Sequence, residues 1–536
     1  MRNRLLIPGK IGHGHGLADG RPAGWLPEFA RRGASCERKG GQARRKHPHA
    51  SLLLLAAFLF QTILMPHASA QRVAPDAPFP SPPARPVPSG KPVPLSLVEA
   101  VALGLRDNRG IKSAYLERVA QKFDLVVAES LFRPRIDLAA DLVRQRVGGI
   151  TSTDLAMTPS ISWLAPTGAS AGLVWDRRQR LDGGSRALSD TTSFSISQPL
   201  LRGAGFDVTL APVRIARLQE QINHLRLKST VSDTVTAIIF AYRDLLRAQQ
   251  QVQLAQLSLE RTQSLLDTNR ALIAAGRMAA ADIVQTESGL ANQEVAVLQA
   301  RQQKASAQLS LLQLLAVDPR TNIVAGDPIR AEQMSIDLDA VIDLGLSSRM
   351  DILAQRKALE QDRQALIVAR NNRLWNLSVT GSISRQRGND ALLGQTDPRT
   401  DHAVGLQLDI PIGDPSLRQR EIQATTTIRT AELRYQDLCQ SVETQIRDAA
   451  QTVEANWQQL EAARRARNLA AKALELEQEK LKVGRASNFE VLSFQTDLRA
   501  ADTQELTASI TYLNALTALD QQIGNTLDTW RIDLND

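Results

Sequence analysis

"KVGRASNFEVL", residues Lys482–Leu492, repeats the pattern of "AAGRMAAADIV", residues Ala274–Val284, and this repetition decides the fold. In both stretches an arginine follows a glycine, and an acidic residue stands six positions after the glycine. At a constant offset of 208 residues, the matched pairs are Gly276 with Gly484, Arg277 with Arg485, and Asp282 with Glu490. Glycine reaches positive φ at little cost, so it suits a tight turn between two helices. Because each stretch lies between long helical patterns, the sequence predicts the same helical hairpin twice.

We call these two stretches, Ala274–Val284 and Lys482–Leu492, the corners. The duplication extends well beyond them. "LGLRDNRGI" (Leu103–Ile111) matches "LGLSSRMDI" (Leu344–Ile352) at an offset of 241 residues. "SISQPLL" (Ser195–Leu201) matches "QLDIPIG" (Gln407–Gly413) at an offset of 212, so the first copy carries 29 additional residues before this point. Repeats of this size are much longer than a solenoid period of about 20–50 residues. We therefore expect two large repeats, at residues 95–320 and 335–527.

Long uninterrupted helices are predicted on the N-terminal side of each corner. Ala211–Ala274 contains no glycine and no proline after Pro212, and Leu417–Val483 contains neither residue. At about 1.5 Å per residue each helix is roughly 95–100 Å long, which favours coiled-coil packing. The second helix has an apolar seam with heptad-like spacing, formed by Val442, Ile446, Ala449, Val453, Trp457 and Leu460. Further helices are predicted at Leu95–Phe132, where Ser96 and Glu99 form a capping box, at Ala279–Val317 and at Asn488–Ile523.

Short segments with period-two alternation lie between the helices. Apolar and polar residues alternate over Ile136–Leu142 and Phe194–Ile196 in the first repeat, and over Leu377–Ile383 and Val404–Ile410 in the second. Such strands have one apolar and one polar face. In an exported protein this pattern fits a membrane barrel, apolar toward lipid and polar toward its lumen. A soluble sandwich has the same alternation and is the alternative.

The first 94 residues are predicted to direct export. A basic stretch at Ala43–His49 precedes an apolar run at Ala50–Met65 and the small-residue cleavage pattern at Ala68–Ala70. This order is typical of a secretory signal, and the run is shorter than the ~20 residues that a membrane-spanning helix needs. An uncleaved anchor is the alternative. We expect residues 1–49 to be a leader or gene-model extension with the signal n-region, 50–70 the h-region and cleavage site, and 71–94 a Pro-rich linker.

Charge and histidine content exclude several function classes. The chain has a formal charge of +8, and residues 1–49, with eleven basic and three acidic residues, account for all of it. The remainder is neutral overall and offers no clustered positive charge for nucleic acid. After residue 70 the histidines are His224 and His402 and the cysteine is Cys439, without a nucleophile elbow or metal-spaced cluster. We therefore expect no enzymatic activity, no cofactor, no metal site and no nucleic-acid partner.

The order and spacing of the motifs resemble the TolC-type outer membrane efflux proteins, also called outer membrane factors. The resemblance rests on "LSLVEAVALGLRDN" from Leu95, "SISQPLLRGAG" from Ser195, the two corners and the stretch Val483–Gly524. It implies an α+β membrane protein with an internal duplication. Three protomers, with about four strands each, would form a twelve-stranded outer-membrane β-barrel, continued by a long periplasmic α-helical coiled-coil barrel.

The same resemblance implies the function and the partners. The chain would be an outer membrane exit duct of a tripartite efflux or type I secretion system, passively conducting substrates to the exterior. Its partners would be two further copies in a homotrimer, a periplasmic adaptor protein, an inner-membrane transporter and outer membrane lipid. The alternative is a periplasmic coiled-coil structural or adaptor-like protein that does not enter the membrane.

The resemblance also implies roles for the corners. In the family an acidic ring lies at the narrow periplasmic end of the tunnel, and its position matches Glu490, with Asp282 as the acid of the first repeat. Helix capping is the alternative for both, since an acid in the first turn favours a helix N-terminus. The exposed tips, Gly276, Arg277, Gly484 and Arg485, would contact the adaptor. Leu481 and Ala486 stand where the family has gate residues, and Ser493 stands where it has a second acidic ring residue.

One segment departs from the family pattern. "SISWLAPTGASAGLVWDRRQR" (Ser160–Arg180) lies within the 29 additional residues and predicts a hairpin around Pro166–Thr167–Gly168. It would extend the periplasmic rim, form an external loop or add strands to the barrel, and the sequence leaves all three open. Trp163, Trp175 and Trp375 are candidate anchors at the membrane interface, with packing as the alternative.

Overall fold

The computed structural model describes residues 92–534, except 183–184, 391–393 and 484. The chain divides into two units, Met1–Arg85 and Pro86–Asp536, and the described residues belong to the second. The predicted leader, the h-region with its cleavage site and residues 71–91 of the predicted linker therefore lie outside the described residues, as does Gly484.

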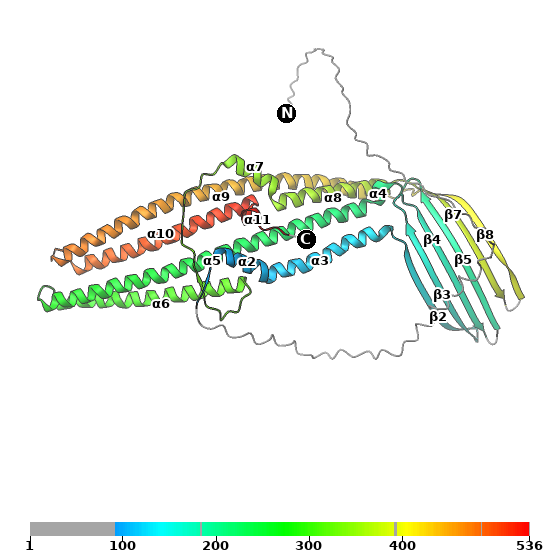
Figure 1. Ribbon diagram of the computed structural model, residues 1–536. Helices are drawn as coiled ribbons and strands as arrows, with labels where there is room; N and C mark the ends of the chain where they lie inside the picture. The colour runs from blue at the N-terminus through cyan, green and yellow to red at the C-terminus, as the bar shows by residue number, and fades with distance from the viewer. Residues whose placement is uncertain (1–91, 183–184, 391–393, 484, 535–536) are drawn as a thin grey trace, which may run out of the picture. The chain divides into compact units, whose positions relative to one another are not determined.

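Each repeat consists of two short helices, strands and a long helical hairpin (Figure 1). The helices of the first repeat are α2 (Leu97–Asp107), α3 (Arg109–Glu129), α4 (Phe206–Thr209), α5 (Ala211–Ala274) and α6 (Ile283–Leu314), with 3₁₀ turns η1 (Ser130–Phe132) and η2 (Ala280–Asp282). Those of the second are α7 (Leu338–Ser348), α8 (Met350–Asn372), α9 (Ser416–Lys482) and α10 (Asn488–Ile523), followed by α11 (Thr526–Thr529). The predicted long helices are confirmed to within a residue at each end.

The first predicted helix is broken, which the sequence pattern did not indicate. At Asn108 the backbone leaves the helical region (φ −57°, ψ 129°), and its side-chain oxygen accepts a hydrogen bond from the Ile111 N–H at 3.1 Å. The second repeat breaks in the same way at Arg349 (φ −60°, ψ 130°), 241 residues later. The capping box of Ser96 and Glu99 is confirmed at the start of α2.

The two repeats also share a close packing contact. A Cβ added at Gly104 would lie 2.1 Å from Cδ1 of Ile238, and one added at Gly345 would lie 2.3 Å from Cδ1 of Ile446. The glycines are 241 residues apart and the isoleucines 208 apart, which are the two offsets of the sequence repeat. The duplication therefore holds in three dimensions, because the same short helix meets the same long helix in both repeats.

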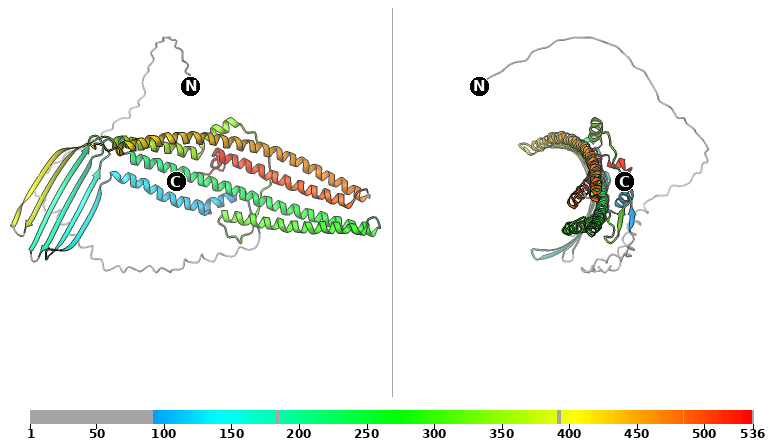
Figure 2. Two further views of the ribbon diagram at one scale, coloured as in Figure 1. Left: turned by 180° about the vertical axis from the view of Figure 1, so that it is seen from behind. Right: turned by 90° about the vertical axis from the view of Figure 1, so that its left-hand side faces the viewer.

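The long helices form one curved layer (Figure 2). Toward the corners α9 packs on α10, α10 on α5 and α5 on α6, while toward the strands α8 packs between α9 and α5, and α3 lies beside α5. The predicted seam of α9 is confirmed, because Val442, Ile446, Val453, Trp457 and Leu460 are buried against α7, α8 and α10. Within the described part of the chain, no helix has both the length and the apolar character needed to cross a membrane.

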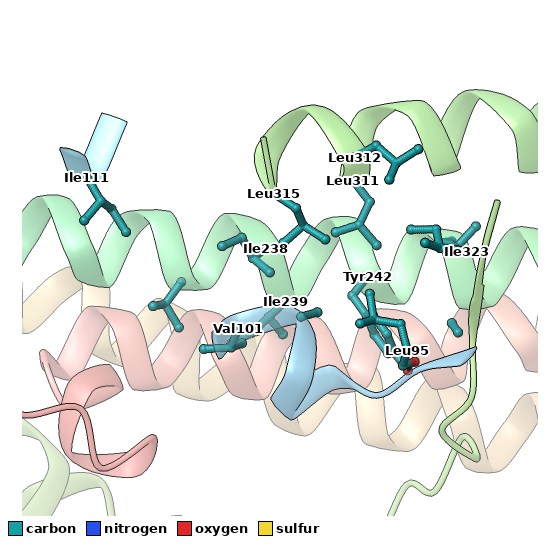
Figure 3. Close-up of a cluster of buried hydrophobic side chains, with 14 of the residues drawn as sticks. Leu95, Val101, Ile111, Ile238, Ile239, Tyr242, Leu311, Leu312, Leu315 and Ile323 are labelled. Carbon is teal, nitrogen blue, oxygen red and sulfur yellow. Dashed lines mark hydrogen bonds between the residues drawn. The ribbon is translucent and has the colours of Figure 1, made fainter. Parts of the chain in front are cut away.

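A small parallel sheet anchors the segments before α2 and after α6. β1 (Val93–Leu95) pairs in parallel with β6 (Ile323–Ala325). Both strands pack against a buried cluster around Tyr242 of α5 (Figure 3). The Tyr242 hydroxyl lies 2.9 Å from the Leu95 carbonyl oxygen and 2.8 Å from Asp327 Oδ2. This pairing joins residues more than 200 positions apart and was absent from the sequence prediction.

The strands beyond the helices form one antiparallel sheet of six, in the order β2-β3-β4-β5-β7-β8. They are β2 (Arg135–Val147), β3 (Ile150–Leu164), β4 (Ser170–Asp182), β5 (Ser185–Pro199), β7 (Asn376–Asp390) and β8 (Gly394–Asp409). The prediction of about four strands per protomer is therefore wrong. The additional residues of the first repeat form part of β3 and β4, which pair with each other and with β2 and β5 and so enter the sheet itself.

Candidate functional site

Both corners are closed by the same backbone hydrogen bond. The Arg277 N–H donates to the carbonyl of Leu272 at 2.9 Å, and the Arg485 N–H donates to the carbonyl of Lys480 at 2.8 Å. This six-residue closure is a common way to end a helix. Gly276 has φ +68° and open space where a Cβ would be. The prediction that glycine makes the turn is confirmed for Gly276, whereas Gly484 lies outside the described residues.

The predicted tip residues meet only in part. A groove of about 690 Å³ lies between the two corners, and its lining includes Arg277 and Asp282 from the first and Lys482 and Phe489 from the second. Arg485 and Glu490 do not line this groove. Both tip arginines are exposed, and within the described ranges neither guanidinium makes an ion pair. The tips thus present free positive charge beside an apolar side chain, since Phe489 is 65% exposed.

Glu490 caps helix α10. Its carboxylate accepts hydrogen bonds from the Ser487 N–H at 2.7 Å and the Ser487 hydroxyl at 2.9 Å, and its own N–H donates to Ser487 Oγ at 3.2 Å. The backbone hydrogen bond, followed by that from the hydroxyl, lowers the pKa of Glu490 below its usual 4.5. Because the side chain remains exposed, capping and a place in an acidic ring are compatible, and the ring stays a prediction.

Asp282 differs from Glu490 although the sequence aligns them. It is the N-cap of α6, yet its carboxylate makes no capping hydrogen bond and is exposed. Its backbone carbonyl accepts a hydrogen bond from Asn488 Nδ2 at 3.4 Å. The carboxylate of Asp282 is therefore free for another role, which the structure leaves as a prediction.

A buried polar network joins the two hairpins near the tips, and the sequence did not indicate it. Asn269 of α5 donates through Nδ2 to Thr286 Oγ1 of α6 and to Asn488 Oδ1 of α10, at 2.8 Å each. Asn488 Nδ2 lies 2.8 Å from the same threonine oxygen. In the sequence, the available indication was a polar residue at a position of each helix that faces a neighbouring helix. Only the packing of α5, α6 and α10 brings the three side chains together.

Two of the three positions where the family has polar residues, Leu481 and Ala486, are apolar here. Leu481 is buried in a cluster with Leu265, Leu474, Val491 and Leu498, and Ala486 packs on its edge. Ser493 is exposed. The cluster closes the contact between the two hairpins by apolar packing, in place of a hydrogen-bonded lock at these positions.

The strands place an apolar face opposite a polar one. Ile136, Ile161, Leu173, Phe194 and Ile383 are paired in succession from β2 to β7 and therefore share one face. All five are exposed. Others exposed on this face are Leu138, Leu142, Trp163, Trp175, Ile196, Val379, Val404, Leu406 and Leu408. A contiguous exposed apolar surface of this kind marks an interaction with lipid or protein, so it confirms the predicted alternation but not yet its environment.

The opposite face is rich in small polar residues and is hollowed. Ser162, Gly172, Ser195, Ser382 and Ala403 are paired in succession across the sheet and line a hollow of about 470 Å³. Toward the strand ends far from the helices, this face carries charged residues that neutralise one another. Arg180 contacts Asp154 at 2.7 Å, and Arg178 contacts Asp176 at 2.9 Å. A concave polar face and a convex apolar face are what a water-filled barrel requires.

One protein-family model, described as outer membrane efflux protein, matches residues 103–317 and 341–525, which covers both repeats. Among solved structures the chain is similar to the CmeC outer membrane channel of Campylobacter jejuni, with 15% identity, a TM-score of 0.61 and coverage of 80% of this chain and 86% of that one. It is similar to the open state of the MtrE outer membrane channel of Neisseria gonorrhoeae, with 17% identity, a TM-score of 0.62 and coverage of 80% and 89%. It is also similar to the outer membrane protein VceC of Vibrio cholerae, with 15% identity, a TM-score of 0.61 and coverage of 80% and 96%. Curated proteins yield no match.

Proposed function

This chain belongs to the outer membrane efflux protein family, and we propose that it is the exit duct of a tripartite efflux or type I secretion system. As a family member it is located in the outer membrane and extends into the periplasm. It would conduct substrates passively, without catalysis or a cofactor, from a periplasmic adaptor and an inner-membrane transporter to the exterior. Family membership favours this function over that of a periplasmic coiled-coil protein that does not enter the membrane.

The observation that carries the proposal is the amphipathic sheet with two unpaired edges. Among the described residues, β2 and β8 each pair with one neighbour only. Unpaired strand edges are not tolerated in lipid, because their backbone groups have no water to bond. A single chain cannot close this sheet on itself if the polar face is to enclose a channel, so we infer that copies pair β2 of one with β8 of the next.

Three copies of this six-stranded sheet supply eighteen strands, in place of the twelve that the resemblance implied. Barrel diameter grows roughly linearly with strand number, so an eighteen-stranded barrel is about one and a half times as wide as a twelve-stranded one. Barrels of 16–18 strands leave an aqueous channel. The lumen proposed here is lined by the serine-rich polar face.

Exposed apolar residues along α3 support contact between protomers. Leu116, Val119, Phe123, Val126 and Val127 recur at helical spacing and are all more than 45% exposed in the single chain. α3 lies at one border of the helical layer and α9 at the other (Figure 1). Exposed leucines also lie along α9, at Leu433, Leu469 and Leu476. In a trimer these borders would meet and remove both sets of side chains from water.

We assign the corners to the periplasmic end of the duct. The exposed Arg277 and Arg485, together with Gly276 and Gly484, would contact the adaptor. Glu490 and Asp282 would supply three carboxylates each around the opening, and a ring of carboxylates in a narrow lumen favours cations.

Cell fractionation and structure determination of the assembled protein test the proposal together. We expect a heat-modifiable trimer in the outer membrane fraction, pores in planar bilayers, and eighteen strands in the density of the detergent-purified trimer. A soluble periplasmic monomer would overturn the exit-duct function. A pore-forming trimer with twelve strands would overturn only the widened barrel.

A further inference from the structure

Arginines line the apolar face of the sheet at its end away from the helices. Arg144 follows Leu142, the last apolar residue of this face on β2, and Arg385 follows Ile383, the last on β7. On β4 Arg177 follows Trp175 and is itself followed on this face by Gln179 and the exposed Leu181. Arg146 and Arg387 occupy the following positions on β2 and β7, and all five side chains are exposed. We call these five residues the arginine belt.

Strand register places the belt at one level of a tilted sheet. Arg177 pairs with Met157, which pairs with Ala140, so Arg177 is level with a position four residues before Arg144. Arg387 pairs with Asp190, which pairs with Arg177, so Arg387 is level with Arg177. Arg385 therefore lies two residues nearer the helices than Arg177. From β2 to β7, which are four strand pairings apart, the belt therefore shifts six residues toward the helices.

This slope is the one a barrel in a membrane requires. Strands of outer-membrane barrels tilt by about 35–45°, lie about 4.8 Å apart and rise about 3.3 Å per residue, so a line parallel to the membrane shifts by roughly 1–1.5 residues per strand. Six residues over four steps correspond to about 1.5 residues per strand at the steep end of this range. Arg144, Arg177 and Arg385 thus lie at about the same height, where the apolar run that includes Leu142, Trp175 and Ile383 ends.

The belt arginines lack the acidic partners that arginines on the opposite face have. Within the part of the chain whose side chains the structure describes, they form no ion pair or hydrogen bond, whereas Arg178 and Arg180 are each paired with an aspartate. The one described acid on the apolar face at this height is Asp190, which accepts a hydrogen bond from Trp175 Nε1 at 2.7 Å. Asp190 stands opposite Arg177 and Arg387 in the strand register and offsets one of the five charges, so the belt keeps a net positive charge beside an apolar surface.

We propose that the arginine belt binds the phosphate groups of a lipid in the outer leaflet of the outer membrane. The inference rests on the proposed function, since a barrel in lipid surrounds Leu142, Trp175 and Ile383 with acyl chains and leaves the arginines among headgroups. The planar guanidinium donates paired hydrogen bonds to phosphate oxygens. Arginine is costly on the lipid-facing surface at the membrane midplane and nearly neutral at its border, which is where the belt lies.

A lipid titration tests the belt. The purified trimer in neutral detergent is titrated with diphosphoryl lipid A, and its dissociation temperature is followed. We expect the lipid to raise this temperature, and the triple variant R144Q/R177Q/R385Q to weaken its apparent affinity by tenfold to a hundredfold, because each basic residue adds a comparable attraction to anionic lipid. The matched control is R178Q/R180Q, which removes the same type of charge from the opposite face of the same sheet and is expected to bind as the unaltered protein does.

Three comparisons decide the outcome. Phosphate-free lipid A and inorganic phosphate at equal concentration are expected to leave the dissociation temperature unchanged. Equal stabilisation by phosphate-free lipid A, or undiminished binding by the triple variant, would overturn the belt. Pore formation in phosphatidylcholine bilayers is measured in parallel: a triple variant that still forms pores but has lost lipid binding supports the inference, whereas failure of the unaltered protein to form pores overturns the exit duct itself.

Discussion

At the scale of single residues, one buried hydroxyl fixes how the repeat junctions lie against the long helices. Tyr242 is 1% exposed, and its hydroxyl contacts Leu95 and Asp327 while accepting a hydrogen bond from the Asp327 N–H at 3.3 Å. Burial, followed by the hydrogen bond to Asp327, raises the pKa of Tyr242, so the hydroxyl stays protonated. The side chain thus links β1, the segment after β6 and α5.

Replacing Tyr242 with phenylalanine should destabilise the protein. The change removes a buried hydrogen bond, which costs about 0.5–1.5 kcal/mol. The Leu95 carbonyl keeps the Gly326 N–H and the Asp327 carboxylate keeps the Leu97 N–H as donors. Thermal unfolding followed by circular dichroism checks this, with Tyr115→Phe as the control. Tyr115 is 36% exposed and makes no hydrogen bond through its hydroxyl with any described residue. Equal midpoints for both variants would contradict the anchoring role.

Two substitutions separate the charge of Glu490 from its capping role. Glu490→Gln removes the negative charge but keeps a side chain that can complete a capping box, so we expect weaker cation selectivity with little loss of stability. Ser487→Ala keeps the charge and removes the cap, so we expect unchanged selectivity and a loss of about 1 kcal/mol. Reversal potentials in planar bilayers under a salt gradient measure selectivity. If both variants retain the original reversal potential, Glu490 does not belong to a selectivity ring.

The pH dependence of selectivity follows from the lowered pKa of Glu490. A carboxyl whose folded-state pKa is depressed keeps its charge as pH falls to the usual value near 4.5, whereas its contribution to stability is full above that value and is lost as pH falls further toward the folded-state pKa. Cation selectivity should therefore persist from pH 7 to about pH 4.5. Loss of selectivity above pH 5, measured in the same bilayers, would assign the effect to another group.

At the scale of elements, the sequence predicted the long helices well because they contain no helix breaker and have a continuous apolar seam. The start of α6 was placed too early, since Ala280–Asp282 forms a 3₁₀ turn before the α-helix begins at Ile283. The break at Asn108 was missed because Asn108 both interrupts and caps a helix without a proline or glycine between the two parts.

The matched glycines Gly104 and Gly345 should resist substitution. Alanine at either position would bring a Cβ against an isoleucine methyl of the long helix, and such overpacking costs about 1–3 kcal/mol, offset in part by up to ~1 kcal/mol of helix propensity. We expect lower unfolding temperatures for Gly104→Ala and Gly345→Ala. The control is Gly289→Ala, whose Cβ would make an ordinary 3.4 Å contact with Leu492 and should be neutral or stabilising. A drop for Gly289→Ala as large as for the other two would contradict the packing explanation.

At the scale of the whole molecule, the added hairpin of β3 and β4 increases the number of strands but keeps the antiparallel order and the two-faced alternation of the sheet. The turn at its periplasmic end is fixed to the loop after β5, because the Gly205 N–H donates to the Thr167 carbonyl at 3.0 Å. A Cβ on Gly168, which has φ +94°, would lie 2.2 Å from the Gly203 carbonyl oxygen. The hairpin is thus built into the base of the sheet.

Deleting residues 150–184 should narrow the proposed barrel. The deletion joins β2 to β5 through Gly148 and Gly149, and leaves four strands per chain with the same inside–outside alternation. Since diameter grows roughly in proportion to strand number, we expect it to fall to about two thirds. The largest polyethylene glycol that enters the pore from the barrel side measures this width independently of the constriction at the other end. An unchanged polymer cut-off in a correctly assembled trimer would show that β3 and β4 do not widen the lumen.

The sequence by itself determined the duplication, the long helices, the corners and the alternation of the strands, because each depends on periodicity or on a residue with special backbone freedom. The capping difference between Glu490 and Asp282 belongs to the sequence, since Ser487 stands three residues before Glu490 and completes a capping box, whereas Ala279 stands three residues before Asp282. Only the tertiary structure decided the number of strands, since a hairpin such as Ser160–Arg180 has the same local pattern whether it joins the sheet or extends from it. The Asn269–Thr286–Asn488 network, the pairing of β1 with β6 and the alignment of the arginine belt likewise join residues distant in the chain, and their physical basis is packing and strand register.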